Sequence, residues 1–315
     1  MKIVVTGGAG FIGSHLCERL LRDGHSLAVV DEMNDFYPPE MKRANLAAVR
    51  QAGPFAFAEA AVEDEVAMTA FFEAERPDAV IHVAARAGVR PSLKAPLLYE
   101  QANVRGTLVV LEAARRAGAR RFIFASSSSV YGAANRVPFR EDDDSLRPIS
   151  PYAATKIAAE KLCYTYAHLY GLKVVCLRFF TVYGPRQRPD LAIRMFMERI
   201  DAGLPVPVFG DGGMGRDYTY VDDIVNGVTA ALGHEAAFDV FNLGNSSPVL
   251  LRDMVKAVEA ALGKQARIDF QPEQPGDVPI TFADISKAGR LLGYRPATSF
   301  AEGLARQAAW LRAQR

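Results

Sequence analysis

A tyrosine and a lysine four residues apart carry the clearest chemical signal, in the stretch SPYAATK at 150–156. Ser150 is a preferred N-cap residue and the proline after it suits a first helical turn, so we expect a helix to begin here. Tyr152 and Lys156 then lie on one face of that helix. An ammonium beside a phenol lowers the pKa of the phenol, which predicts that Tyr152 acts as an acid and base near neutral pH. Taken alone, such a pair is usually ordinary helix surface.

A run of four serines, in ASSSSVYG at 125–132, follows an apolar segment that we expect to be a strand. Open α/β sheets bind their ligands at the carboxyl ends of the strands. A serine at this point is therefore placed to hydrogen-bond a reacting hydroxyl. The serine run and the tyrosine–lysine pair together favour a catalytic interpretation over a surface helix.

Glycines dominate TGGAGFIG at 6–13, between a predicted strand and a predicted helix. Gly7, Gly10 and Gly13 follow one another at intervals of three residues. Gly8, Gly10 and Gly13 match the pattern GxGxxG. Glycines let the backbone turn tightly and approach a pyrophosphate, while the helix N-terminus offers unpaired N–H groups. A plain glycine turn is the alternative.

Asp31 ends the next strand, 18 residues after Gly13. A carboxylate there accepts hydrogen bonds from a ribose and repels a 2′-phosphate, which favours NAD over NADP; a simple turn residue is the alternative.

Two arginines follow a buried strand end in LRFFTVYGPRQRPD at 177–190. Arg186 and Arg188 lie in a loop bounded by prolines. Either this loop is a solvated surface turn, or it binds an anion.

Strands alternate with helices of ten or more residues through the first half of the chain, which predicts right-handed βαβ units and a doubly wound, parallel α/β sheet. After about residue 180 the alternation loosens, with more proline and glycine. We expect a cofactor domain at 1–180, which also receives about 220–245, and a smaller substrate lobe at 181–315. Strands are expected at 2–6, 27–31, 55–60, 79–85, 121–127, 173–180 and 238–244.

The composition is that of an ordinary globular protein, with 315 residues, 50% of them hydrophobic, and a net charge of +1. Such a charge creates no basic field for nucleic acid or an anionic membrane. No apolar run is long enough to cross a membrane and no signal peptide is recognisable, so a cytoplasmic protein is expected. We expect no metal site, because Cys17, Cys163 and Cys176 show no metal-binding spacing and read as buried thiols.

The glycine segment, the serine run before VYG and YAATK together resemble the extended short-chain dehydrogenase/reductase family, in particular its nucleotide-sugar epimerases. Further resembling motifs are GVRPS (88–92), NVRGT (103–107), VFGDG (208–212), RDYTYVDD (216–223) and PGDV (275–278). The resemblance implies a Rossmann fold, NAD as cofactor and an isomerase acting on a UDP-sugar. It also implies transient oxidation at sugar carbon 4, followed by rotation of the 4-keto sugar and return of the hydride to its other face. The helix at 108–118 is expected to pair with its copy in a homodimer.

By that resemblance Ser127, Tyr152 and Lys156 form the catalytic trio. The residues expected to contact NAD are Gly7, Gly10, Phe11, Ile12, Gly13, Asp31, Asn34, Val62, Ala84, Ala85, Asn103, Ser126, Tyr152, Lys156 and Phe179. The residues expected to contact the UDP-sugar are Gly88, Val89, Arg90, Ser127, Ser128, Tyr152, Phe180, Thr181, Arg186, Arg188, Val208, Phe209, Arg216 and Asp277.

The sugar is expected to be a glucuronate. The stretch RFFTVYGPRQRPD and the segment at 31–44 resemble UDP-glucuronate 4-epimerases, and a carboxylate at carbon 6 favours an arginine partner. Arg188 is the main candidate, with Thr181 and Ser128 beside it, and Arg186 is a weaker one. UDP-glucose or UDP-N-acetylglucosamine epimerisation and UDP-glucuronate decarboxylation remain alternatives, as do a one-way dehydrogenase and a regulatory NAD-binding protein.

The chain departs from many relatives at two positions. Gln274 stands where an arginine often binds the diphosphate. Ala61 stands where an aspartate often touches adenine, so weaker retention of NAD is expected.

Overall fold

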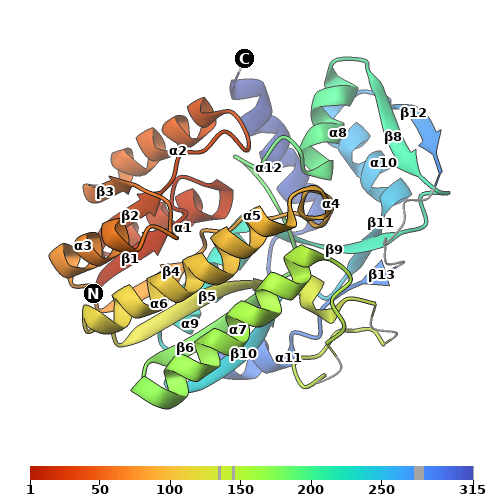
Figure 1. Cartoon of the computed structure of the whole chain (residues 1–315). Coiled ribbons are helices and arrows are strands. Elements are labelled where there is room, and N and C mark those ends of the chain that lie inside the picture. Colours follow the sequence, from red (N-terminus) through yellow and green to blue (C-terminus); the bar gives the residue numbers. More distant parts are fainter. Residues whose placement is uncertain (134–135, 144–145, 273–279, 315) are drawn as a thin grey trace.

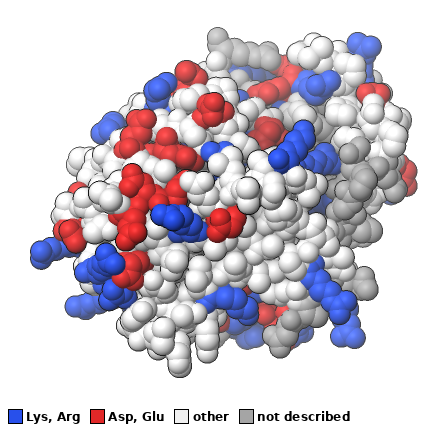
Figure 2. All heavy atoms as spheres, viewed as in Figure 1, with Lys and Arg blue, Asp and Glu red and all other residues white. Residues whose placement is uncertain are grey.

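The computed structural model describes residues 1–133, 136–143, 146–272 and 280–314. Figure 1 shows a large sheet flanked by helices and a smaller lobe, at the upper right, that contains β8, β12, α8 and α10. On the face seen in Figure 2, acidic and basic side chains are interspersed and no continuous basic surface is formed by the residues drawn in colour. No helix in the described ranges is long and apolar enough to cross a membrane.

The large sheet consists of seven parallel strands in the order β10-β6-β5-β4-β1-β2-β3. The chain runs outward from β1 to β3 and then returns to the other side of β1 to form β4, so the strand order reverses between β1 and β4. Ligands of open sheets bind outside the strand ends at such a reversal. The strands are β1 (Lys2–Thr6), β2 (Ser26–Asp31), β3 (Phe55–Glu59), β4 (Ala79–His82), β5 (Arg121–Ser127), β6 (Lys173–Phe179) and β10 (Phe238–Leu243).

Helices cover both faces of this sheet (Figure 1), which explains why its strands read as continuous apolar runs. In β1, Ile3 and Val5 pack on one face, and Val4 packs on the other. The helices of the first face are α1 (Phe11–Arg22), α2 (Pro39–Ala52) and α9 (Val221–Ala231), and those of the second are α3 (Glu65–Glu75), α6 (Gly106–Arg116) and α7 (Pro151–Tyr170). The doubly wound parallel fold predicted from the sequence is confirmed.

Helix α7 begins where the sequence predicts. The Ser150 side chain accepts a hydrogen bond of 3.2 Å from the backbone N–H of Ala153, and Pro151 is the first helical residue. In front of α6 the chain forms α4 (Val89–Lys94), α5 (Pro96–Glu100) and a π-helical turn (Gln101–Arg105). The hydrophobic pattern did not predict that turn, since a single wide turn leaves the apolar periodicity on both sides intact.

The second lobe is built around β9 (Gly215–Tyr220). This strand pairs antiparallel with β11 (Pro248–Leu250) and parallel with β13 (Ile280–Thr281) and β7 (Thr181–Tyr183). A separate parallel pair consists of β8 (Pro205–Phe209) and β12 (Arg267–Gln271). The remaining helices are α8 (Ala192–Asp201), α10 (Leu251–Leu262), α11 (Ser286–Leu291) and α12 (Phe300–Ala313).

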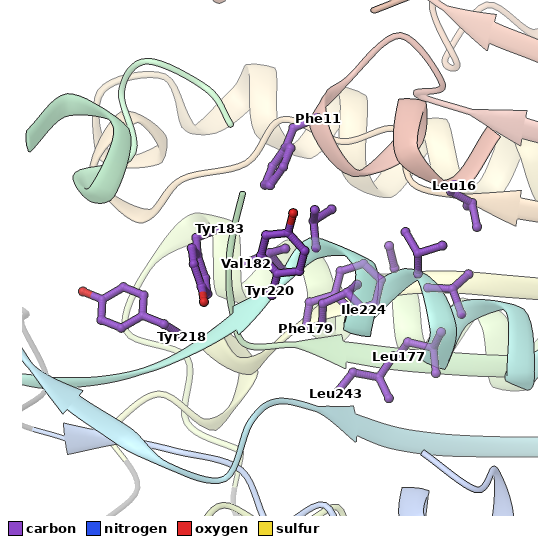
Figure 3. Packing of buried hydrophobic residues seen from close by; sticks show 14 of the residues in the cluster. Phe11, Leu16, Leu177, Phe179, Val182, Tyr183, Tyr218, Tyr220, Ile224 and Leu243 are labelled. Carbon is purple, nitrogen blue, oxygen red and sulfur yellow. The ribbon is translucent and has the colours of Figure 1, made fainter. Parts of the chain in front are cut away.

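Aromatic packing joins the two parts of the molecule. The Tyr183 ring lies 5.7 Å from the ring of Tyr220 and 5.2 Å from that of Phe300, between centroids. Figure 3 shows these tyrosines continuing the core that Phe11 and Leu16 of α1 form over the sheet. The end of β7, from which the loop to Arg188 leaves, is therefore fixed by packing on both sides. The three cysteines are buried free thiols, as predicted.

Candidate active site

A cavity of about 760 Å³ follows the carboxyl ends of the large sheet and continues to the second lobe. It runs from the glycine turn at 7–13, past Tyr152, to Phe209 and Arg216. This volume lies within the usual range for ligand sites and exceeds what a small metabolite needs. One continuous cavity therefore connects the glycine turn with the second lobe.

The glycine turn leads directly into α1. Gly7 has a left-handed φ of 73°, and a Cβ there would lie 2.7 Å from the backbone nitrogen of Ala84. A Cβ on Gly13 would overlap the Gly7 carbonyl oxygen. No described side chain caps α1, and its first turn holds no acidic residue. The helix N-terminus therefore presents its N–H groups to the cavity, which suits a pyrophosphate.

Asp31 lines the cavity at the end of β2, although it is only 6% exposed. Its carboxylate accepts hydrogen bonds of 3.1 Å from the N–H groups of Ala9 and Met33, and Lys42 Nζ lies 3.3 Å away. Lys42 also donates to Asn34 Oδ1 at 3.0 Å. Lys42 was not among the predicted site residues, because a lysine in a helix ordinarily faces water and only the fold turns this one inward.

Tyr152 and Lys156 both line the cavity, as the helical spacing predicts. The expected pKa effect, however, was wrong. Burial raises the pKa of Tyr152, and a hydrogen bond with Ser127 and the charge of Arg188 oppose that rise. Lys156 instead donates a 2.7 Å hydrogen bond to the Ala125 carbonyl oxygen, and burial lowers its own pKa to about 8. The lysine is anchored to β5, so its ammonium does not set the pKa of Tyr152 in this structure.

Ser127 is oriented by its own turn. Its Oγ accepts hydrogen bonds from the backbone N–H and the hydroxyl of Ser129, at 3.2 and 3.0 Å. Ser127 thereby caps the short 3-10 turn at Ser128–Tyr131 and faces Tyr152. The serine run thus supplies both the hydroxyl beside the tyrosine and the group that orients it.

Asn103 is buried in the π-helical turn and is not part of the cavity lining. Its amide bonds both backbone groups of Arg86, with N–H···O distances of 2.8 and 3.0 Å, and donates to Thr155 Oγ1 at 3.0 Å. Asn103 therefore connects the loop after β4 to the first turns of α7, and the cofactor contact expected for it stays a prediction.

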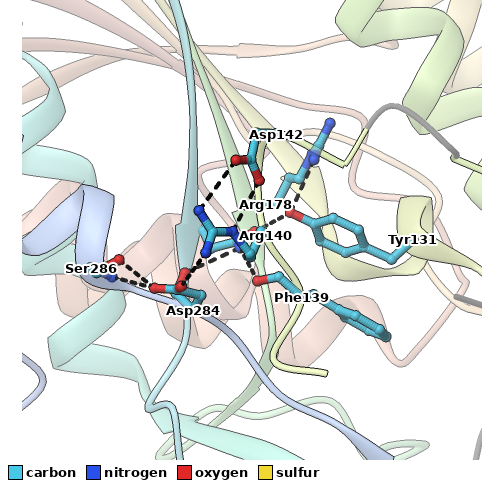
Figure 4. Close-up of polar contacts among 8 residues, drawn as sticks. Tyr131, Phe139, Arg140, Asp142, Arg178, Asp284 and Ser286 are labelled. Atoms are coloured by element: carbon cyan, nitrogen blue, oxygen red, sulfur yellow. Dashed lines mark hydrogen bonds and ion pairs between the residues drawn. The ribbon is translucent and has the colours of Figure 1, made fainter. Parts of the chain in front are cut away.

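A buried polar network lies behind the serine run. Glu160 of α7 accepts hydrogen bonds from Ser126 Oγ at 2.6 Å and from Arg178 Nε and Nη2 at 2.9 and 2.8 Å. Arg178 also donates to the Tyr131 hydroxyl at 3.0 Å, which in turn donates to Asn242 Oδ1 at 2.7 Å. Figure 4 shows Arg178 and Tyr131 beside Phe139, and next to them the exposed Arg140 with its ion-pair partners Asp142 and Asp284. The network holds β5, β6, β10 and α7 in register beneath the site.

Arg188 lines the cavity with its side chain 14% exposed. Its Nε and Nη2 donate to the two carboxylate oxygens of Asp190, at 2.9 and 2.7 Å, and Nη2 lies 3.4 Å from the Ala87 carbonyl oxygen. The guanidinium carbon lies 4.9 Å from the centroid of the Phe36 ring. Burial acts to lower the pKa of Arg188, but the hydrogen bonds and charge of Asp190 raise it, so the side chain stays charged.

Arg186 is directed away from the cavity. It has a left-handed φ of 63°, and its Nη2 lies 2.5 Å from Glu18 Oε1 on α1. The neighbouring carbonyl of Pro185 is bonded by His15 Nε2 at 3.0 Å. The expectation that Arg186 contacts the substrate is corrected, because its side chain binds α1. In extended backbone two arginines two residues apart would point to the same side, and the left-handed turn at Arg186 breaks that alternation.

Val208 is also not part of the cavity lining, because side chains alternate along β8. Its side chain is 3% exposed in the core, whereas Pro207 and Phe209 line the cavity. The Arg90 guanidinium lies 5.0 Å from the Phe209 ring. Asp277 and Gln274 lie outside the described residues.

The remaining predicted contacts all line the cavity. They are Gly10, Phe11, Ile12, Asn34, Val62, Ala84, Ala85, Ser126, Phe179, Gly88, Val89, Ser128, Phe180, Thr181 and Arg216.

Comparison with known proteins agrees with this geometry. The model of the NAD dependent epimerase/dehydratase family matches residues 3–244. The chain belongs to this family. Within it, the chain is 42% identical over 308 residues to the UDP-glucuronate 4-epimerase of Thermodesulfobacterium geofontis, covering 98% of this chain and 95% of that protein.

Two solved structures of this family superpose along the whole chain. The UDP-glucuronic acid 4-epimerase of Bacillus cereus, in complex with UDP-glucuronic acid and NAD, has a TM-score of 0.93 at 35% identity and covers 100% of both chains. The UDP-glucose 4-epimerase of Thermotoga maritima with UDP-glucose has the same TM-score and identity, covering 100% of this chain and 99% of that one.

Proposed function

We propose that this chain is a NAD-dependent UDP-glucuronate 4-epimerase, which interconverts UDP-glucuronate and UDP-galacturonate. The observation that carries the proposal is Arg188, a charged guanidinium that lines the same cavity as Tyr152 and acts on its electrostatics. A sugar carboxylate next to the reacting carbon would find its charge partner there. The similarity to UDP-glucuronate 4-epimerases over nearly the whole chain supports the assignment.

The residues at the glycine turn fit NAD. The turn has no room for a Cβ at Gly13, and the uncapped N-terminus of α1 would bind the pyrophosphate, with Asp31 at the adenosine ribose and Val62 near adenine. When bound, NAD supplies hydride acceptance and return at sugar carbon 4. Ala61 provides no side-chain carboxylate near adenine, so we expect NAD to be held there by backbone contacts.

As a phenolate, the form that the Ser127 hydrogen bond and the charge of Arg188 favour, Tyr152 would take the proton from the 4-hydroxyl and return it after the sugar has turned. Ser127, fixed by Ser129, hydrogen-bonds the same oxygen and shares the developing negative charge. Lys156 keeps α7 against β5 and contributes a positive charge to the cavity wall.

The second lobe would hold the UDP half. Arg216 is proposed to bind the diphosphate and Phe209 to contact the uracil. Asp277, outside the described residues, is proposed to bind the uridine ribose.

The substrate carboxylate is proposed to bind Arg188, with Thr181 and Ser128 donating hydroxyls. A 4-keto uronate is a β-keto acid and loses carbon dioxide when its carboxylate bond aligns with the carbonyl. A fixed carboxylate would suppress that loss. Replacing Arg188 with methionine should slow epimerisation of UDP-glucuronate and yield a UDP-pentose, and unchanged turnover without pentose would contradict this role.

The substrate is tested by incubating the purified protein separately with UDP-glucuronate and UDP-glucose and resolving the products by chromatography. We expect UDP-galacturonate from the first and little product from the second. Conversion of the neutral sugar alone would overturn the proposal and favour UDP-glucose epimerisation, the activity named for the Thermotoga maritima structure.

We also propose that the protein is a cytoplasmic homodimer that pairs through α6 and α7. The two helices pack on each other and expose Leu108 and Tyr164, which are 40% and 52% exposed. Exposed apolar side chains on adjacent helices are typical of a helix-pairing interface. The buried free thiols are consistent with a reducing compartment.

A further inference from the structure

We propose that Asp190 is a positioning residue that makes the site selective for uronates. By binding one edge of the Arg188 guanidinium, Asp190 directs the other edge toward the substrate carboxylate. This inference rests on the proposed function, because it concerns the same carboxylate. It assigns a role to an acidic residue that would otherwise be expected to repel an anionic sugar.

The backbone that carries Arg188 is fixed independently of Asp190. On one side, Arg186 and the Pro185 carbonyl are bound to Glu18 and His15 of α1. On the other, the buried Gln187 side chain donates to the Val182 carbonyl oxygen at 3.0 Å and accepts from the Gln307 amide at 2.8 Å. The position of the Arg188 Cα is therefore set by the fold, and what remains to be fixed is the direction of its long side chain.

Asp190 fixes that direction through a bidentate pair. Both of its oxygens are used, one by Nε and one by Nη2 of Arg188, at 2.9 and 2.7 Å. Such a planar pair is the most directional ion pair that an arginine forms. Among the described residues, Nη1 has no hydrogen-bond acceptor, and the second contact of Nη2, to Ala87, is long at 3.4 Å. The Nη1–Nη2 edge is thus the edge left for a ligand.

One further contact supports this orientation. The Phe36 ring stacks near the guanidinium carbon, at 4.9 Å, and limits rotation of its plane. The Asp190 side chain is 45% exposed and that of Arg188 is 14% exposed, so water reaches the carboxylate side of the pair while the guanidinium is largely buried.

Charge gives the inference a distinctive signature. Asp190 lines the cavity together with Arg188. With Arg188 present, its negative charge is paired and its effect on a bound anion is indirect. Without Arg188, the same carboxylate would be unpaired beside the substrate carboxylate and would repel it. Removing the charge of Asp190 should therefore weaken uronate binding in the wild type and strengthen it when Arg188 is absent.

The experiment measures the affinities of UDP-glucuronate and UDP-glucose by titration calorimetry for four proteins: wild type, Asp190→Asn, Arg188→Met and the double variant. The control is Asp23→Asn, which removes the charge from an exposed aspartate outside the cavity whose two carboxylate oxygens lie 3.1 and 2.8 Å from Arg19 Nε. Turnover of UDP-glucuronate by the wild type is recorded separately. Failure of that turnover contradicts the proposed function, whereas the affinities decide the role of Asp190.

We expect Asp190→Asn to weaken UDP-glucuronate binding about tenfold, as the loss of a charge-assisted pair implies, and to leave UDP-glucose within about twofold. In the Arg188→Met background the same substitution should strengthen UDP-glucuronate binding, and Asp23→Asn should change neither ligand. Equal losses for both sugars would show a merely structural role and overturn the inference. Tighter uronate binding by Asp190→Asn alone, or no reversal in the Arg188→Met background, would overturn it as well.

Discussion

The buried ion pair between Glu160 and Arg178 predicts a large loss of stability from a small substitution. The two side chains are each 5% exposed. Glu160 accepts two hydrogen bonds from Arg178 and one from Ser126, and Arg178 donates one more to Tyr131. Replacing Glu160 with glutamine keeps the shape but leaves the guanidinium charge buried without its counter-charge. Breaking a buried pair in this way costs about 3–5 kcal/mol.

That cost is a large part of the roughly 5–15 kcal/mol by which most domains are stable. For a chain of this size, about 2 °C of Tm per kcal/mol is expected, so Glu160→Gln should lower the Tm by about 6–10 °C. Thermal unfolding followed by circular dichroism measures this directly. The matched control is Glu302→Gln, which removes the same charge from a half-exposed pair with Arg306 and should change the unfolding free energy by about 0.5 kcal/mol or less.

The outcome also bears on the site, because Ser126 lines the cavity and bonds Glu160. A Tm for Glu160→Gln within about 2 °C of the wild type would refute the reasoning, since it would mean that the Arg178 charge finds water or another partner. A second variant, Arg178→Met combined with Glu160→Leu, removes both charges and should recover most of the lost stability.

Three further predictions concern single residues of the site. Gly13→Ala should abolish NAD binding, because its Cβ would overlap the Gly7 carbonyl oxygen. Calorimetry measures the affinity for NAD, and an unchanged affinity would contradict the assignment of the glycine turn to NAD. Arg216→Met should weaken UDP binding about tenfold while leaving NAD binding unchanged, as separate titrations would show. Lys156→Met tests the buried ammonium: its pKa of about 8 is below the ordinary 10.5, so the unfolded chain holds more protons between those values and wild-type stability should rise with pH there, relative to the variant. Urea unfolding of both proteins across that pH range measures the free energy of unfolding. The same pH dependence of that free energy in both proteins would contradict the prediction.

Much of the fold was predictable because its strands are buried on both faces and therefore read as apolar runs. The glycine turn and the Ser150 cap were also predictable, since their local geometry allows few residue types. Most of the candidate site followed from the same logic: strand ends in a parallel sheet meet at one edge, so the serine run, Tyr152 and Arg188 had to lie near one another.

The remainder depends on side-chain direction, which spacing does not encode. Lys42 reaches Asp31, at the end of β2, only because α2 packs against α1 in the fold. Arg186 and Arg188 have the same chemistry, yet one binds Glu18 and the other lines the cavity. The pKa of Tyr152 depends on burial and on Arg188, 36 residues away along the chain, rather than on the lysine one helical turn away.

The central claim is most directly tested with UDP-glucuronate that carries deuterium at sugar carbon 4. The purified protein is incubated with this substrate, and the product is examined by nuclear magnetic resonance. The account predicts UDP-galacturonate that keeps the deuterium at carbon 4, because the hydride removed from the sugar returns to the same carbon from the other side. Absence of UDP-galacturonate, or a product in which solvent hydrogen has replaced the deuterium, would contradict it.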